Sequence, residues 1–219
     1  MSLLLEKVRR LSRPAPSMGF RLSQPSLRSG VLLLTFPVPD LPAGVADALV
    51  WDGLEGATGG KDIPWGVFLT QPKIEEVAQL KEKGCDFIIL GPSAPAEILR
   101  DEAPGRWLTI EPGLSSDLAR ALNSLPVEGI VLSLEVAPLS IQQLLQVHSL
   151  SVLLQKPLLA RVSPQLDMAA LPALVEAGVR GVMVKAKPPQ LKRWHQTLSS
   201  LTPPRLPGEA VLPPLEEPR

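Results

Sequence analysis

The sequence predicts an α/β fold in which eight parallel strands and their connecting helices close into a small (β/α)8 barrel. Short β-branched or leucine-rich runs alternate with amphipathic segments, and one helix–turn–strand unit recurs along the chain. The chain has 219 residues, at the small end of the range for such a barrel. An open doubly wound sheet is the alternative, but it favours a glycine-rich fingerprint after the first strand, and LLLTFPVPD has none.

The expected strands are short apolar runs bounded by glycine, proline or polar turn residues. They are Val31–Phe36, Ala48–Asp52, Trp65–Leu69, Phe87–Leu90, Trp107–Glu111, Ile130–Glu135, Leu158–Ser163 and Val182–Ala186. Because each of the later runs is followed by an amphipathic segment, the crossovers are expected to be helical and the strands parallel.

Clear helices are expected after most of these strands. They are Lys73–Lys83, Ser115–Ser124, Ser140–Leu154, Met168–Ala177 and Pro189–Leu201, with a shorter one at Ala94–Asp101. Ser115 and Ser140 stand where an N-cap oxygen is needed, and Gly84 and Gly178 stand just past helix ends. The first two links are expected to be irregular, with a short helix around Pro42–Ala46 and a loop without a helix at Gly53–Pro64.

The two ends of the chain differ from the barrel, so three parts are expected: an N-terminal helix and arm (1–30), the barrel (31–202) and a tail (203–219). The N-terminal part carries six basic residues against Glu6 alone. It is expected to form an amphipathic helix at Ser2–Leu11 capped by Ser2, although an organelle transit peptide has the same composition. The tail is proline-rich and is expected to be extended.

Composition excludes several classes of function. The formal net charge is zero, which disfavours nucleic-acid binding, and no apolar run is long enough for a membrane span. Cys85 is the single cysteine and there are two histidines, so we expect no metal site and no disulfide. We expect a cytoplasmic protein without a cofactor, and the sequence leaves open whether copies of the chain form a homo-oligomer.

Two phrases repeat the same helix–glycine–strand form: GCDFIILG from Gly84 and AGVRGVMV from Ala177. They resemble the corresponding phrases of the aldolase-type TIM-barrel superfamily, and the resemblance covers about residues 31–201. It implies the barrel fold and no particular substrate, because these phrases occur with many chemistries. Members that bind phosphate use glycine-rich loops after the seventh and eighth strands, whereas SPQLD and KAKPPQ here contain no glycine.

Strand parity predicts which side chains face the inside of the barrel. In each late strand the uniformly apolar set is expected to face the helices, which leaves the mixed set inside. The inward residues are Thr109 and Glu111, Ser133 and Glu135, Arg161 and Ser163, Met183 and Lys185, while Asp52 closes the second strand.

These inward residues form a candidate site at the C-terminal mouth, where barrels of this kind carry their active sites. Lys185 is a candidate Schiff-base nucleophile, and Glu135 or Glu111 would move protons. Arg161 is suited to hold the anionic group of a ligand, with Ser133, Ser163 and Asp52 as further binding residues. The first hypothesis is therefore a lyase or isomerase that acts on a small anionic metabolite of the keto-acid or sugar-acid class.

Two other functions remain open. Inward charges of opposite sign also pair simply to satisfy each other, which would make the barrel a non-catalytic binding or scaffold protein. An FMN-dependent oxidoreductase is disfavoured because the loops after the seventh and eighth strands contain no glycine.

The glycine-rich loop Gly53–Asp62 departs from the P-loop spacing. It is open to three interpretations: a phosphate cradle, a lid over the mouth or a plain flexible loop.

Overall fold

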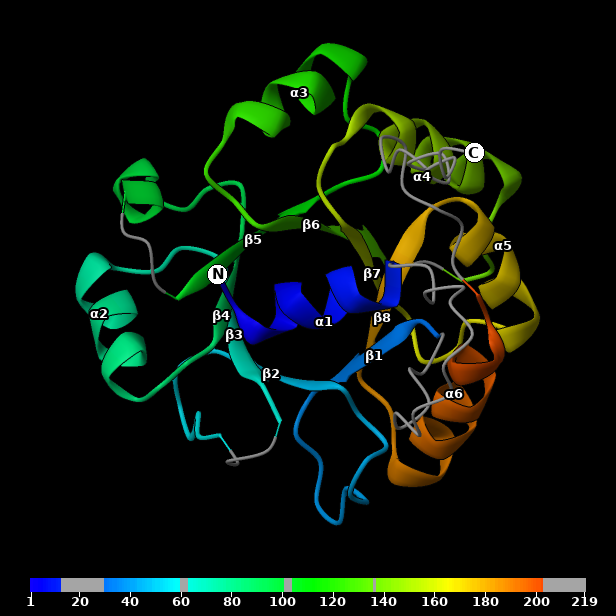
Figure 1. Cartoon of the computed structure of the whole chain (residues 1–219), viewed down its shortest axis with the longest axis horizontal. Coiled ribbons are helices and arrows are strands. Elements are labelled where there is room, and N and C mark those ends of the chain that lie inside the picture. The colour runs from blue at the N-terminus through cyan, green and yellow to red at the C-terminus, as the bar shows by residue number, and fades with distance from the viewer. Residues whose placement is uncertain (13–29, 60–62, 101–103, 136, 203–219) are drawn as a thin grey trace, which may run out of the picture.

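The computed structural model describes residues 1–12, 30–59, 63–100, 104–135 and 137–202, and in it eight parallel strands close into a barrel in chain order (Figure 1). The strands are β1 (Leu32–Thr35), β2 (Ala48–Asp52), β3 (Trp65–Leu69), β4 (Phe87–Leu90), β5 (Gly105–Ile110), β6 (Gly129–Leu134), β7 (Leu158–Val162) and β8 (Val179–Val184). β1 pairs with both β2 and β8, so no strand is left as an edge. The predicted TIM-barrel fold is confirmed.

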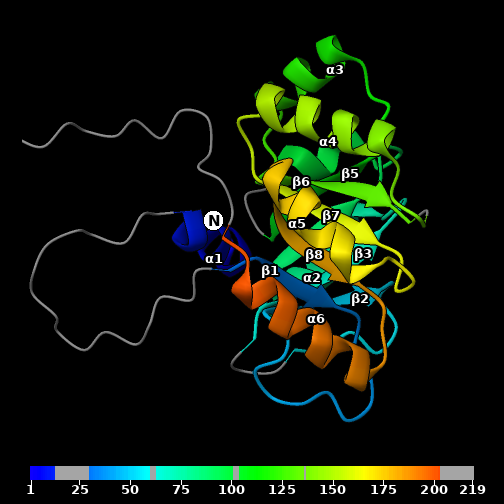
Figure 2. The same ribbon diagram turned by 90° about the vertical axis from the view of Figure 1, so that its right-hand side faces the viewer.

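Helices surround the barrel from β3 onward, as Figures 1 and 2 show. They are α2 (Ile74–Glu82), η1 (Ala96–Arg100), α3 (Ser116–Ala121), η2 (Leu122–Ser124), α4 (Ile141–Leu153), η3 (Met168–Ala170), α5 (Leu171–Glu176) and α6 (Pro188–Ser200). The described residues between β1 and β2 form turns, so the expected short helix around Pro42–Ala46 is wrong. The link between β2 and β3 contains no helix among its described residues, so the first two units are irregular as predicted.

The helix ends follow from the residues that the sequence places there. The Ser140 hydroxyl accepts the backbone N–H of Gln143 at 3.2 Å, and Ser115 does the same for Leu118 at 3.4 Å. Gly84 and Gly178 have φ values of 74° and 109°, where a side chain would be strained. Each of these four residues therefore marks one end of a helix: Ser115 and Ser140 the starts of α3 and α4, and Gly84 and Gly178 the ends of α2 and α5.

Alternate strand residues divide between two apolar layers. Ile130, Leu132 and Leu134 of β6 belong to an outer cluster with Val147 and Leu150 of α4. The other set builds an inner cluster that fills the barrel interior. Its members include Leu34, Val50, Phe87, Ile89, Trp107, Val131, Leu159 and Met183. The alternation that predicted the direction of the late strands is therefore present in the structure.

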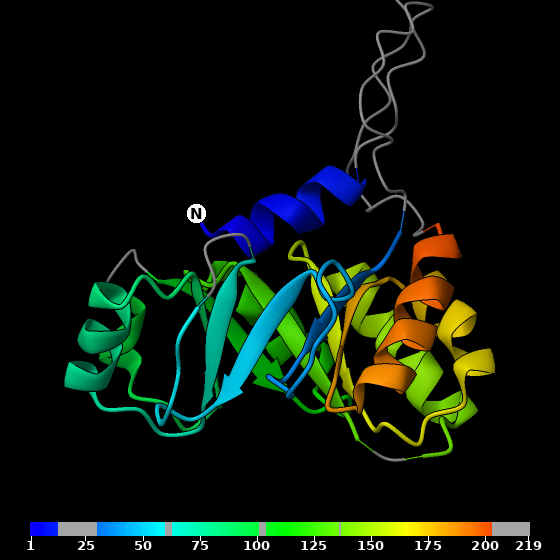
Figure 3. The ribbon, with the colours of Figure 1, turned by 90° about the horizontal axis from the view of Figure 1, so that it is seen from below.

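The N-terminal helix α1 (Leu3–Ser12) lies across the end of the barrel at which the strands begin (Figure 3). Leu4, Leu5 and Val8 are buried in the inner cluster. The Ser2 hydroxyl accepts the backbone N–H of Leu5 at 3.2 Å, which confirms the predicted cap. The helix closes this end, so the cavity described below lies at the opposite end, where the strands finish.

Two carboxylates that precede strands hold the start of α1. Asp86, just before β4, accepts the backbone N–H groups of Leu3 and Leu4 at 2.7 and 3.0 Å. Glu128, just before β6, accepts the backbone N–H of Ser2 at 2.8 Å and also the Ser2 hydroxyl. Both carboxylates lie at the positive end of the helix dipole, which stabilises negative charge.

Parts of the predicted organisation fall outside the described residues, namely 13–29 of the N-terminal arm and the proline-rich tail 203–219. Among the helices that the structure describes, none has both the length and the apolar character needed to span a membrane.

Candidate functional site

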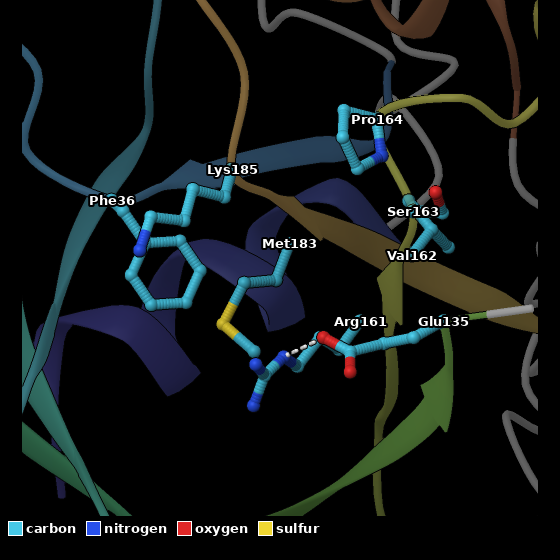
Figure 4. A pocket seen from close by; sticks show the side chains of 8 residues that line it. All are labelled: Phe36, Glu135, Arg161, Val162, Ser163, Pro164, Met183 and Lys185. Carbon is cyan, nitrogen blue, oxygen red and sulfur yellow. Dashed lines mark ion pairs between the residues drawn. The ribbon is translucent and has the colours of Figure 1, made fainter.

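A cavity of about 330 Å³ opens at the end of the barrel where the strands finish (Figure 4). It is formed by the ends of β1, β6, β7 and β8, which are adjacent around the barrel. The lining residues are Phe36, Glu135, Arg161, Val162, Ser163, Pro164, Met183 and Lys185. Four of the seven residues predicted to form the site, Glu135, Arg161, Ser163 and Lys185, are therefore brought together.

Strand register explains why these side chains meet. Arg161 of β7 pairs with Ser133 of β6 and with Met183 of β8, so these three residues share one level of the barrel. Two residues further along each strand, the chain reaches Glu135, Ser163 and Lys185, which point the same way because side chains alternate with a period of two. The cavity is therefore built on regular strands and their first following residues.

Arg161 extends across the barrel interior rather than out of it. Its Nε donates to Glu135 Oε1 at 2.6 Å, and its guanidinium carbon lies 4.9 Å from the ring centroid of Phe68. Phe68 belongs to β3, which stands opposite β7 in the closed order of eight strands. A cation over an aromatic face at this distance is attracted by the ring quadrupole.

The Arg161 side chain is 24% exposed, so its head forms part of the cavity floor. Only the Nε–H is used by Glu135. The two terminal nitrogens carry four more N–H donors, and the structure gives Arg161 no second ion pair among the described residues. This free edge is the part of the guanidinium that matches a carboxylate or phosphate in a two-point contact.

Lys185 forms a second cationic group beside the same ring. Its Nζ lies 5.5 Å from the ring centroid of Phe36, and the guanidinium carbon of Arg161 lies 5.8 Å from that centroid. Lys185 is exposed and has no ion pair with any carboxylate in the described part of the chain. A nearby cation and burial both favour the neutral, nucleophilic form of a lysine. Lys185 shares the Phe36 ring with the cationic Arg161, but it is not buried.

The remaining predicted residues lie outside the cavity lining. Glu111 follows β5 and Asp52 ends β2; both side chains are exposed and neither lines the cavity. Ser133 is half-buried one level below, beside Arg161, and is also absent from the lining. Ser163 lines the cavity, but its hydroxyl already accepts the backbone N–H of Gln165 at 3.2 Å.

Sequence reasoning missed the two phenylalanines that surround Arg161. Phe36 follows β1, and Phe68 is the inward residue near the end of β3. A signal for Phe68 was available, because Trp65, Val67 and Leu69 form the apolar set that faces the helices. Because side chains alternate along a strand, this apolar set indicates that Phe68 lies inside the barrel.

Both histidines of the chain lie away from the mouth. His148 is on α4 and His195 is on α6, outside the barrel. Among the described residues, no group of three or more histidine, cysteine or acidic side chains is placed to hold a metal ion.

The glycine-rich loop lies against the outer wall. Ala57 belongs to a second outer cluster, which also contains Trp65, and Gly56–Gly59 line a separate hollow of about 370 Å³ with Lys83. None of the described loop residues lines the mouth cavity. The interpretation of this loop as a lid therefore has no support in the described residues.

Comparison with known proteins reveals the fold and no family. No protein-family model matches the chain, and no curated protein is similar to it in sequence. Among solved structures, N-(5'-phosphoribosyl)anthranilate isomerase from Pyrococcus furiosus is similar with a TM-score of 0.56 and 11% identity, over 78% of this chain and 100% of the other.

Two further structures share the architecture. The HpcH/HpaI aldolase from Desulfitobacterium hafniense has a TM-score of 0.53 at 10% identity, over 76% of this chain and 90% of its own. The homocysteine methyltransferase MmuM from Escherichia coli has a TM-score of 0.53 at 14% identity, over 77% and 96%. The chain therefore shares the (β/α)8 barrel fold with these structures, and at these identities the likeness concerns the fold alone.

Proposed function

We propose that this barrel is an enzyme of the lyase or isomerase type that acts on a small anionic metabolite at its C-terminal mouth. The observation that carries the proposal is the joint placement of Arg161, Lys185 and Glu135 in one cavity of about 330 Å³. Two cations and one carboxylate from three consecutive strands provide both an anion site and a proton-transfer group.

Anion binding is the part of the proposal that the positions of the side chains support most directly. Glu135 holds the Nε side of Arg161, which leaves the terminal nitrogens for the ligand. Lys185 supplies a second positive charge on the adjacent strand. The loops after β7 and β8 contain no glycine to bring backbone N–H groups around a phosphate, so a carboxylate of the keto-acid or sugar-acid class fits better.

The chemistry proposed for Lys185 depends on the substrate carbonyl. The neutral amine adds to the carbonyl carbon. The resulting carbinolamine takes up one proton from the solvent and its hydroxyl leaves as water, which gives an iminium ion. The iminium accepts the electron pair released when a neighbouring C–H or C–C bond breaks. Glu135 is the carboxylate that would take or return the proton, because its oxygen already lies in the cavity and its side chain is 53% exposed.

The kinds of similar structures support catalysis by this fold in general terms. Those structures are an isomerase, an aldolase and a methyltransferase, according to their names. They support no particular substrate for this chain, because a fold shared at 10–14% identity hosts many reactions.

A non-catalytic binding barrel is the second candidate, and one observation favours it. Glu135 already neutralises Arg161, and Lys185 is exposed. An ion pair in which the two charges serve only to satisfy each other would have the same geometry. The two candidates differ in whether Lys185 reacts.

Borohydride trapping separates these candidates. The full chain is incubated with pyruvate, then with other keto acids and simple aldehydes, and is reduced with borohydride before peptide mass spectrometry. An enzyme of the proposed type gains the mass of the reduced adduct at Lys185. The Lys185→Met variant loses the adduct, whereas Lys187→Met, a matched control two residues away and outside the cavity lining, retains it.

Two outcomes would count against the catalytic proposal. The first is the absence of any adduct at Lys185 with every carbonyl compound tested, combined with unchanged substrate turnover in Lys185→Met. The second is an adduct distributed equally over Lys185 and exposed lysines elsewhere, which indicates chemical modification without a site.

A further inference from the structure

Positive and negative charges are unequal among the described side chains that line the mouth cavity. Arg161 and Lys185 are cations and Glu135 is the single carboxylate, so this lining has one positive charge in excess. Glu135 and Arg161 compensate each other through their contact of 2.6 Å. One negative charge on a ligand therefore balances the lining, whereas a second one would lie near Glu135 with no further cation to offset the repulsion.

Other charged residues at this end of the barrel do not change the balance. Asp52 ends β2, and Glu111 and Lys187 come soon after the ends of β5 and β8. All three side chains are exposed and none lines the cavity. Because water and salt screen such charges, selection of a ligand by charge depends on the three charged residues of the lining.

The surface between the two cations is apolar. Phe36 and Met183 belong to the inner cluster and line the cavity. Lys185 Nζ and the guanidinium carbon of Arg161 lie 5.5 and 5.8 Å from the centroid of the Phe36 ring. In Figure 4, the Phe36 ring and the Met183 side chain lie between the Lys185 amine and the Arg161 guanidinium. A ligand that reaches both cations therefore covers apolar surface.

The described lining side chains offer few acceptors for the hydroxyl protons of a ligand. Arg161 and Lys185 are donors only. One Glu135 oxygen already accepts the Nε–H of Arg161, and the Ser163 hydroxyl already accepts the backbone N–H of Gln165. A sugar acid has a hydroxyl on most of its carbons, and a hydroxyl that leaves water without finding a partner costs affinity. The lining therefore matches a hydrocarbon chain better than a polyhydroxy chain.

We infer, on the basis of the proposed function, that the substrate is a monocarboxylic keto acid with a short apolar chain. Its one carboxylate meets the free edge of Arg161, its carbonyl carbon faces Lys185, and its chain covers Phe36 and Met183. The cavity discriminates against dicarboxylic keto acids and against sugar acids. Its volume of about 330 Å³ is at the small end of the range for ligand sites, which limits the chain to a few carbons.

Calorimetric titration of the full chain with matched ligands tests this selectivity. If either carboxylate of 2-oxoglutarate is replaced by a methyl group, the product is 2-oxopentanoate or 4-oxopentanoate, so the three compounds have the same chain length. The better of these two monocarboxylates is expected to bind at least about tenfold more tightly than 2-oxoglutarate. 2-Oxohexanoate is likewise expected to bind at least about tenfold more tightly than 2-oxogluconate, its hydroxylated counterpart.

Glu135→Gln tests the contribution of charge separately. The amide removes the negative charge of the lining and keeps an oxygen that accepts the Arg161 Nε–H. The affinity for 2-oxoglutarate, relative to that for the better monocarboxylate, is expected to rise by about fivefold or more. Glu111→Gln is the matched control, because Glu111 is an exposed glutamate after the adjacent strand β5 and lies outside the lining. It is expected to change this ratio by less than about twofold.

The outcomes distinguish the selectivity from the proposed function. Binding of 2-oxoglutarate or 2-oxogluconate as tight as that of its apolar counterpart, and lost in Arg161→Met, would overturn the selectivity and leave an anion site at the mouth. A ratio that Glu135→Gln does not change would overturn the role of charge in it. If no keto acid or sugar acid binds the wild-type chain, the proposed function fails together with the selectivity.

Discussion

Arg161 Nε lies 2.6 Å from Glu135 Oε1, in an ion pair that joins β7 to the end of β6 at the mouth of the barrel. The pair fixes one side of the guanidinium while the Phe68 ring lies 4.9 Å from its centre on the other side of the barrel. Arg161 is thus held in place before any ligand arrives, which lowers the entropic cost of binding. Because of this ion pair, substitution of Glu135 is expected to change the affinity for an anionic ligand.

Substitution of Glu135 is expected to separate its two proposed roles, which are to hold Arg161 in position and to transfer a proton. In Glu135→Gln, the amide oxygen still accepts the Nε–H, so the affinity for a bound carboxylate is expected to change by less than about threefold. Glu135→Ala removes the acceptor, so the guanidinium is no longer held in place. The affinity for the carboxylate is therefore expected to fall by about tenfold or more, the size of effect that a lost hydrogen bond to a charged group has. Calorimetric titration with a keto acid that stabilises the wild-type chain measures both.

Turnover supplies the second readout for the same residue. If Glu135 transfers the proton, Glu135→Gln lowers kcat by about a hundredfold or more while binding is kept. Equal kcat in the wild-type and Gln variants would restrict Glu135 to positioning Arg161. A glutamine variant that binds as weakly as the alanine variant would refute the positioning role.

Phe68 is expected to be a positioning residue for Arg161. Phe68→Leu keeps an apolar side chain and removes the ring, which costs about 0.5–1 kcal/mol of cation–π attraction and corresponds to a two- to fivefold loss of anion affinity. Phe68→Tyr keeps the ring and is expected to retain most of the affinity. Identical affinities for the leucine and wild-type chains would show that the ring does not hold Arg161.

Helix α1 is expected to contribute strongly to stability. Leu4 is fully buried in the inner cluster, and truncation of such a leucine to alanine costs about 2–5 kcal/mol. Leu3 precedes it on the same helix and is 56% exposed, so Leu3→Ala is expected to cost less than about 0.5 kcal/mol. Denaturant unfolding of both variants measures the difference. Similar losses would mean that α1 is not docked as described.

Asp86 is expected to lower the free energy of unfolding as pH rises, which is opposite to the usual effect of a carboxylate. Burial raises the pKa of Asp86, and the backbone N–H groups of Leu3 and Leu4 only partly oppose this effect. The folded chain therefore binds this proton more tightly than the unfolded chain does. Stability linked to Asp86 is present below the usual pKa of 3.8 and is lost as pH rises through the folded-state pKa.

The comparison with Asp86→Asn isolates this effect from the other carboxylates. Asparagine keeps an oxygen acceptor for α1 and does not titrate, so the wild-type chain is expected to lose stability relative to the variant as pH rises from about 4 to 7. Unfolding curves at several pH values measure the difference. A wild-type chain that gains stability relative to the variant over this interval would contradict the prediction.

Cys85 is expected to be unreactive in the folded chain. Its side chain is buried, and burial is the main cause that raises the pKa of the thiol to about 12. The thiolate is the reactive form, so very little is present at neutral pH. A colorimetric thiol reagent is expected to titrate Cys85 only after unfolding. Rapid labelling of the folded chain would show that the start of β4 is accessible.

The fold could be predicted from the sequence because its determinants are local. In β6 and β7, the apolar residues Ile130, Leu132 and Ala160 must face the helices, and this fixes the direction of Glu135 and Arg161. Ser140 and Gly84 mark helix ends by their own chemistry. Such signals need only neighbouring residues, so no long-range contact had to be known.

The site was predicted only in part because distance and depth are not local properties. Parity gives the direction of a side chain, but it does not show that Lys185 is exposed or that Glu111 and Asp52 lie outside the cavity lining. The contact between Arg161 and Phe68 crosses the barrel between opposite strands. Its existence follows from barrel closure and from the length of the arginine side chain, which no short segment of sequence reveals.

The most direct test of the central claim is calorimetric titration of the full chain with small carboxylates, such as pyruvate and gluconate, for the wild type and for Arg161→Met and Lys185→Met. At least one keto acid or sugar acid is expected to bind the wild-type chain, and each substitution is expected to weaken this binding by about tenfold or more. Lys187→Met should bind as the wild type does. Binding that persists unchanged in both cavity variants, or no binding of any carboxylate to the wild-type chain, would show that Arg161 and Lys185 do not form an anion site.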